Sequence, residues 1–179
     1  MYKYGKVINM FDFIRLACAV PDVEVGNTEF NTREIIKYID INKDADVIVF
    51  PELCVTGYTC ADLFFQKTLI DGAKKGIAEI VRTTKDSNSV AAVGAPLIIA
   101  GQLYNCAVVM SHGMVNGIAV KTFIPTYNEY YEKRWFSSAA DLKCASISSK
   151  ELMLDGDYEI PVGNNLVFNC SGVKIGGEI

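Results

Sequence analysis

Residues 45–50 read ADVIVF, a short and nearly continuous apolar run that Pro51 brings to an end. Such runs are typical of strands buried on both faces, as in sheets covered by helices. Residues 13–20 form a second run of this kind, and the segment between the two carries apolar residues at helical spacing. Asn31, three residues before Glu34, resembles a helix-start box. The sequence therefore predicts a strand–helix–strand unit in this part of the chain.

The rest of the chain predicts a further helix and a set of short strands. Residues 62–83 alternate apolar and charged positions at helical spacing. Apolar runs separated by glycine or polar residues predict five strands, at 90–100, 103–110, 114–121, 166–170 and 173–175. Asn116 and Gly117 in the third run predict a bulge, and residues 137–164 read as a polar loop. We expect a mixed α/β fold in which helices cover one face of a sheet and another sheet covers the other face.

The composition indicates one globular domain. The 179 residues include 17 Lys and Arg against 21 Asp and Glu, a net charge of −4, and 50% are hydrophobic. This apolar content excludes disorder, and the lack of a basic block argues against nucleic acid or an anionic membrane as a partner. No apolar run reaches the length of about 18 residues that a membrane span needs. Asp12 and Arg15 interrupt the N-terminal stretch where a secretory signal needs an apolar core, so we expect a cytoplasmic protein.

The histidine and cysteine content narrows the possible chemistry. His112 is the single histidine, which argues against a histidine-rich metal site and leaves carboxylates and lysines as the expected acid–base groups. The six cysteines stand at positions 18, 54, 60, 106, 144 and 170. No two of them have the spacing of a zinc knuckle or of a thioredoxin-like redox motif. We expect them to be reduced, and we expect no metal site.

Glu52 is the first candidate catalytic residue. It follows a buried strand in the segment VFPELCVTGYTCADLF, residues 49–64, and α/β folds place ligand-binding groups beyond the carboxyl ends of such strands. A carboxylate between Phe50 and Leu53 would be partly desolvated, which favours a role as a general base. The alternative is a solvated glutamate in a loop.

Lys121 is the second candidate, at the end of an apolar strand in the segment AVKTFIPTYNEYYEKRWF, residues 119–136. An ammonium group fixed there can stabilise a developing oxyanion, although a surface lysine extending to solvent is the alternative. The segment from Tyr127 to Trp135 mixes aromatic rings with carboxylates. Such a mixture suits recognition of an α-ammonium group, and it equally suits an oligomer interface.

These segments together resemble the nitrilase, or carbon–nitrogen hydrolase, superfamily, and most closely the glutamine-hydrolysing N-terminal domain of glutamine-dependent NAD⁺ synthetases. The resemblance runs from the first strand to the last residue. It implies an α-β-β-α sandwich, incomplete in this chain, with residues 1–179 as the N-terminal part of a glutaminase domain. It also implies L-glutamine as substrate and a C-terminal synthetase domain using ATP, Mg²⁺ and deamido-NAD⁺. That synthetase domain is absent here, and a homo-oligomer is implied for the parent protein.

The resemblance assigns roles residue by residue. Glu52 matches the general base and Lys121 the lysine of a Glu-Lys-Cys triad, while Tyr58 matches a motif tyrosine beside the site. The segment containing Tyr127, Glu129 and Glu132 supplies substrate contacts and a further glutamate of the site. Which of the two glutamates lines the site stays open at this point.

The chain departs from the family pattern at its last residues, GVKIGGEI. In the family the nucleophilic cysteine follows the strand that ends in Glu-Ile, whereas the printed sequence stops at Ile179. We therefore expect the chain to be an inactive fragment of a glutaminase, in which all six cysteines are bystanders. The alternatives are a free-standing nitrilase-family amidase, and a non-catalytic fragment that retains an oligomerisation surface.

Overall fold

The computed structural model describes residues 13–170 and 172–179. Residues 1–12, which carry most of the stretch judged above as unlike a secretory signal, lie outside the described residues. The helices are α1 (Thr28–Ile41), α2 (Lys67–Thr83) and four short 3-10 helices, η1 (Ala61–Phe65), η2 (Glu132–Arg134), η3 (Ala139–Asp141) and η4 (Ser149–Leu152). The strands are β1 (Leu16–Cys18), β2 (Val47–Val49), β3 (Val90–Ile99), β4 (Gln102–Ser111), β5 (Met114–Val120), β6 (Ser146–Ser148), β7 (Glu159–Gly163), β8 (Val167–Cys170) and β9 (Val173–Gly176).

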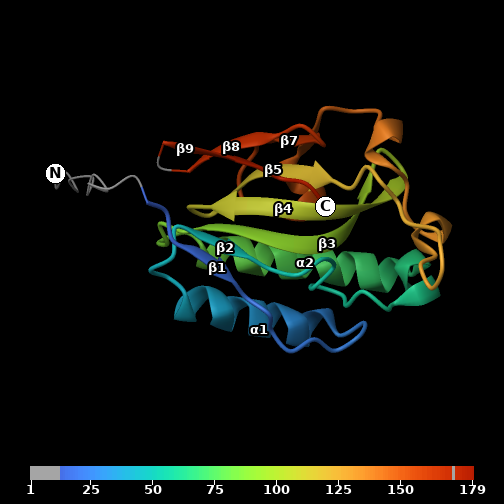
Figure 1. Ribbon diagram of the computed structural model, residues 1–179, viewed down its shortest axis with the longest axis horizontal. Helices are drawn as coiled ribbons and strands as arrows, with labels where there is room; N and C mark the ends of the chain where they lie inside the picture. The colour runs from blue at the N-terminus through green and yellow to red at the C-terminus, as the bar shows by residue number, and fades with distance from the viewer. Residues whose placement is uncertain (1–12, 171) are drawn as a thin grey trace, which may run out of the picture.

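Seven of these strands form one mixed sheet in the order β1-β2-β3-β4-β5-β7-β6. The pairs β1–β2, β2–β3 and β5–β7 are parallel, whereas β3–β4, β4–β5 and β6–β7 are antiparallel. Strands β2 and β5 therefore point in the same direction, although they are far apart in the sequence (Figure 1). Groups that follow these two strands meet at one edge of the sheet, where α/β folds bind ligands.

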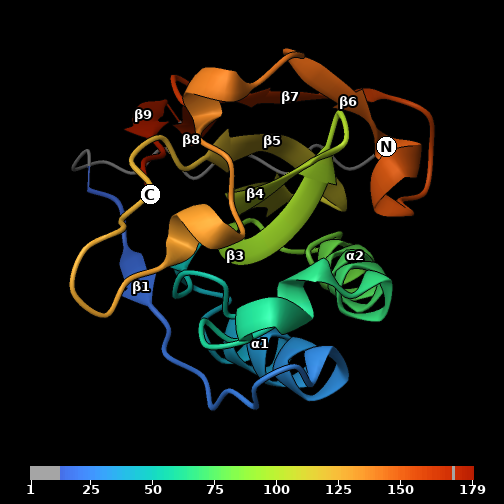
Figure 2. The same ribbon diagram turned by 90° about the vertical axis from the view of Figure 1, so that its right-hand side faces the viewer.

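The fold has layers because different elements pack against the two faces of the main sheet. Helices α1 and α2 lie side by side on one face (Figure 2), and their Ile35 and Ile77 share a buried cluster with Val93 and Ile118 of the sheet. The β8–β9 hairpin covers part of the other face. The Phe168 ring of this hairpin lies so close to Gly117 of β5 that a Cβ on Gly117 would be 2.9 Å from the ring. The mixed α/β class and the helix–sheet–sheet order are therefore confirmed, with two strands in the second sheet.

The structure corrects three expectations about local elements. Helix α1 begins at Thr28, because the side chain of Asn27 accepts a hydrogen bond from the Phe30 N–H, so the helix start expected at Asn31 is wrong. The helix expected over 62–83 is broken at Gln66, between η1 and α2. Residues 137–164 are not all loop, since they contain β6 and β7, and β7 joins the main sheet beside β5.

The bulge expected in the third apolar run is confirmed. Val109 lies opposite Gly117 and Met110 opposite Val115, so Asn116 is the extra residue in β5. None of the helices within residues 13–170 and 172–179 is long and apolar enough to cross a membrane.

Candidate active site

Glu52 is held just beyond the carboxyl end of β2 by a sharp turn of the backbone. The Phe50 N–H donates to the carbonyl oxygen of Ala92 at 2.9 Å, which continues the β2–β3 pairing up to Pro51. Leu53 then adopts φ 52°, in the left-handed region, and its side chain is completely buried. The chain turns back over β3, and the Val55 N–H donates to the Gly94 carbonyl oxygen at 3.2 Å. This turn fixes the direction in which the Glu52 side chain leaves the backbone.

Gly94 allows the turn to lie directly on β3. An ideal Cβ at this position would stand 2.5 Å from the Pro51 carbonyl oxygen and 2.9 Å from the Glu52 carbonyl carbon. All these neighbours are backbone atoms, so no side-chain rotation relieves the overlap. A residue without a side chain is therefore required in β3 opposite the glutamate turn.

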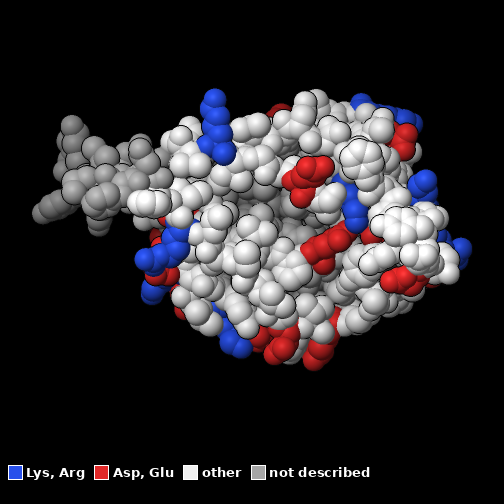
Figure 3. All heavy atoms as spheres, viewed as in Figure 1, with Lys and Arg blue, Asp and Glu red and all other residues white. Residues whose placement is uncertain are grey.

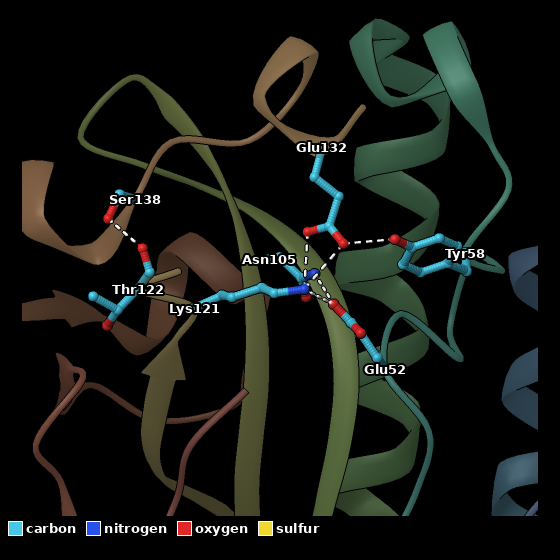
Figure 4. Close-up of polar contacts among 7 residues, drawn as sticks. All are labelled: Glu52, Tyr58, Asn105, Lys121, Thr122, Glu132 and Ser138. Atoms are coloured by element: carbon cyan, nitrogen blue, oxygen red, sulfur yellow. Dashed lines mark hydrogen bonds and ion pairs between the residues drawn. The ribbon is translucent and has the colours of Figure 1, made fainter. Parts of the chain in front are cut away.

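Lys121 comes directly after β5, at the same edge of the sheet. Its N–H donates to the Asn105 carbonyl oxygen at 3.0 Å, so Lys121 and Asn105 lie opposite each other and their side chains share a face. The Lys121 Nζ atom lies 2.6 Å from Glu52 Oε1 and 2.9 Å from Glu132 Oε2 (Figure 4). The Lys121 and Glu132 side chains are 9% and 3% exposed, against 33% for Glu52. One ammonium group thus bridges two carboxylates, of which Glu52 is the more accessible.

Glu132 reaches this cluster because the segment after β5 folds back over the sheet edge. The Ser138 hydroxyl donates to the Thr122 carbonyl oxygen at 2.6 Å, which closes the base of the loop (Figure 4). At its far side Arg134 makes two hydrogen bonds with the Asp62 carboxylate, at 2.7 and 2.8 Å. Phe136 packs edge-on against Phe64, with ring centroids 4.9 Å apart. These contacts tie the loop to η1 and bring Glu132 over Lys121.

The charges at the site stabilise one another. Burial lowers the pKa of Lys121, but the hydrogen bonds and charges of Glu52 and Glu132 outweigh it and raise that pKa overall. The Tyr58 hydroxyl donates to Glu132 Oε1 at 2.6 Å (Figure 4). Desolvation and the neighbouring Glu132 raise the pKa of Tyr58. Near neutral pH the site therefore contains a protonated lysine, a neutral tyrosine hydroxyl and two acidic side chains.

A cavity of about 200 Å³ adjoins Glu52 on the face of the sheet opposite the helices. Small residues of the sheet line it, among them Gly94 and Ala107, together with Asn105 and Glu178. The side of the molecule seen in Figure 3 is hollowed near its middle, with acidic and basic side chains along one side of the hollow. The site thus combines a partly accessible carboxylate, a fixed ammonium group and adjoining space, as an acyl-transfer site requires.

The structure brings four of the six residues expected at the site into one cluster. Glu52, Tyr58, Lys121 and Glu132 are joined by hydrogen bonds and ion pairs. Glu129 is exposed and takes no part. Tyr127 is 63% exposed, with its ring centroid 5.5 Å from that of Tyr130. The geometry therefore distinguishes the two glutamates that the sequence left open.

Asn105 is a site residue that the sequence reasoning missed. Its side-chain amide donates a hydrogen bond to Glu52 Oε1, and the residue is completely buried. The available signal was an amide side chain in the otherwise apolar run of β4, on the face it shares with Lys121.

The two cysteines at the glutamate turn and at the cavity, Cys54 and Cys106, are both buried. Cys54 points to the Gly94 carbonyl oxygen at 3.6 Å, and burial raises the pKa of its thiol to about 12. Cys106 lines the cavity, yet it is completely buried and burial raises its pKa strongly as well. The exposed Cys18 lies in edge strand β1. A thiol reacts as a nucleophile in its thiolate form, and burial disfavours that charged form at Cys54 and Cys106.

The fold is that of a carbon–nitrogen hydrolase. Residues 19–179 match the carbon–nitrogen hydrolase family, and the chain belongs to it. It is similar to the glutamine-dependent NAD⁺ synthetases of Mycobacterium tuberculosis (34% identical over 161 residues) and Mycobacterium leprae (31% over 158 residues). These matches cover 89% and 87% of this chain but only 23% and 22% of the relatives. The crystal structure of a glutamine-dependent NAD⁺ synthetase from Cytophaga hutchinsonii matches with a TM-score of 0.77 and 28% identity, over 91% of this chain and 27% of that one.

Proposed function

We propose that this chain is the glutamine-hydrolysing part of a glutamine-dependent NAD⁺ synthetase, with Glu52 and Lys121 as two members of a Glu-Lys-Cys triad. The observation that carries the proposal is the Lys121 ammonium group held 2.6 Å from Glu52 beside a cavity. The similarity to synthetases named as glutamine-dependent supports the choice of glutamine as substrate.

In the proposed reaction, Glu52 takes the proton of a cysteine thiol, and the thiolate attacks the side-chain amide carbon of glutamine. A C–S bond forms, and the electron pair of the carbonyl double bond moves to oxygen. The Lys121 ammonium group and a backbone N–H stabilise this oxyanion. Because its pKa is raised, Lys121 keeps its positive charge throughout.

Collapse of the tetrahedral intermediate breaks the C–N bond. Glu52 returns the proton to nitrogen, ammonia leaves, and a thioester to the enzyme remains. Glu52 then removes a proton from water, whose oxygen attacks the thioester carbon. The C–S bond breaks, glutamate leaves and the thiol is restored, so each turnover consumes one glutamine and one water.

The ammonia would pass to a synthetase domain in which ATP and Mg²⁺ activate deamido-NAD⁺ for amidation. The relatives are more than four times as long as the segment they share with this chain, which leaves room for such a domain in them. We propose homo-oligomerisation for the parent enzyme as well.

We further propose that the attacking thiol is not one of the six cysteines of this chain. Cys54 lies in the Glu52 turn and Cys106 lines the cavity, and burial raises the pKa of both thiols. On this basis the 179-residue chain by itself does not hydrolyse glutamine.

The test is ammonia release from L-glutamine by the 179-residue chain and by the protein translated from the complete reading frame. We expect release from the second protein only. Clear turnover by the 179-residue chain that disappears in Cys54→Ala would contradict the assignment and make Cys54 the nucleophile. If the longer protein released ammonia from other small amides but not from glutamine, the proposed substrate would be wrong.

A further inference from the structure

Asn105 forms a hydrogen bond with one of the two carboxylate oxygens of Glu52, the proposed base. The Asn105 amide and the Lys121 Nζ atom both donate to Glu52 Oε1 (Figure 4). Within the described part of the chain, no hydrogen bond reaches Glu52 Oε2. One oxygen of the carboxylate is therefore saturated by donors, whereas the other is available to accept a proton.

The orientation of the Asn105 amide follows from this contact. A carboxylate only accepts hydrogen bonds, so the NH₂ group of the amide must face Glu52 and its oxygen must face away. Asn105 Oδ1 is then buried without a hydrogen-bond partner, and no other described side chain leaves a buried polar atom in that state.

An unpaired buried acceptor destabilises a fold, because the oxygen loses water and gains no donor in exchange. A residue whose only role was structural would be better served here by an apolar side chain of similar size, such as leucine. Val109, on the same face of β4 as Asn105, is also buried, so this face of the strand accommodates buried apolar groups. The unfavourable choice points to a role at the site rather than in the core.

We propose that Asn105 is a positioning residue, which fixes the Glu52 carboxylate so that Oε1 stays occupied and Oε2 faces the reacting proton. The proposal rests on the proposed function for the role of Glu52 as a base. The contact itself is measurable without any turnover, so the two proposals fail separately.

The first test is nuclear magnetic resonance of the 179-residue chain with ¹⁵N-labelled asparagine. One side-chain amide proton of Asn105 should resonate downfield of those of the exposed asparagines and should shift as Glu52 gains a proton. The other titratable groups near Glu52 are Lys121 directly after β5, Glu132 and Tyr58 from the two loops, and Glu178 across the cavity. Separate Glu132→Gln and Glu178→Gln variants should keep the pH response of Asn105, whereas Glu52→Gln should abolish it.

The second test compares stability with activity in Asn105→Leu. Removing the unpaired acceptor offsets the lost hydrogen bond, so we expect the melting temperature to stay within about 4 °C of the parent. In the protein translated from the complete reading frame, kcat for ammonia release should fall about 10- to 100-fold with KM little changed. Ser111→Ala is the matched control, because it removes a buried hydroxyl of the same strand that donates to the Asn116 side chain and not to Glu52.

Three results would overturn the proposal. The first is an Asn105 amide that resonates with the exposed asparagines and does not respond to pH. The second is a melting temperature for Asn105→Leu that falls far below that of Ser111→Ala, which would indicate a structural role. The third is an unchanged kcat in Asn105→Leu when Glu52→Ala is inactive.

Discussion

Replacing Gly94 by alanine tests whether the turn that carries Glu52 depends on close contact with β3. The new Cβ would overlap three backbone atoms of the Pro51–Leu53 turn, with separations of 2.9 Å or less. Leu53 is already in the left-handed region at φ 52° and is completely buried, so the turn cannot move away without disturbing the core. Forcing extra atoms into a packed region costs about 1–3 kcal/mol.

For a chain of this length, 1 kcal/mol corresponds to about 2–4 °C in melting temperature, so Gly94→Ala should melt about 2–12 °C below the parent. Thermal unfolding followed by circular dichroism measures the difference. Gly176→Ala is the matched control, because no atom lies within 4 Å of the position its Cβ would take. Equal melting temperatures for the two variants would refute the argument that Gly94 supports the turn.

Three further predictions concern protonation, thiol reactivity and the loop over the site. The pKa values of Tyr58 and Lys121 are raised from 10.0 and 10.5, so above these values the folded state binds more protons than the unfolded state and stability falls as pH rises. Tyr58→Phe should flatten this alkaline decline in stability, measured by denaturant titration at several pH values. An unchanged decline would contradict the raised pKa of Tyr58. A thiol reagent should modify Cys18 in the folded chain far faster than Cys54, and equal rates would contradict the burial of Cys54. Asp62→Asn should loosen the loop that carries Glu132 and speed proteolysis of that loop several-fold, because Arg134 loses a charged partner. The control is Asp155→Asn, which removes a similarly exposed ion pair elsewhere and should leave the rate of proteolysis of this loop unchanged.

The parts of the fold that the sequence predicts are those in which a local pattern has one physical meaning. The buried run at 45–50 and the meander from 90 to 121 became β2 and β3–β5, because continuous apolar strands need cover on both faces. Strand β7 escaped prediction because it is short and contains Pro161, and its two pairs with β5 come from a segment distant in the sequence. Helix α1 was misplaced at its start because Asn27 and Asn31 are both plausible caps, and tertiary contacts decide between them. Asn31 is instead buried and donates to the Val55 carbonyl oxygen.

The residues of the candidate site likewise divide into those with a local signal in the sequence and those without one. Glu52 and Lys121 follow strands whose ends are marked by local sequence patterns, so both could be placed from the amino-acid sequence alone. The choice of Glu132 over Glu129 depends on how the loop folds over β5, a feature without a local signal. Asn105 was missed because its neighbours in β4 are apolar, and its partner Glu52 lies 53 positions away in the sequence.

The most direct test of the central claim is the rate of ammonia release from L-glutamine by three variants of the protein translated from the complete reading frame. Glu52→Ala and Lys121→Ala should each lower kcat/KM by about 10³-fold or more, as expected for members of one catalytic unit. Glu129→Ala, which removes an exposed glutamate of the same loop as Glu132, should leave the rate within about threefold of the parent. Near-parent rates in Glu52→Ala or in Lys121→Ala would contradict the account.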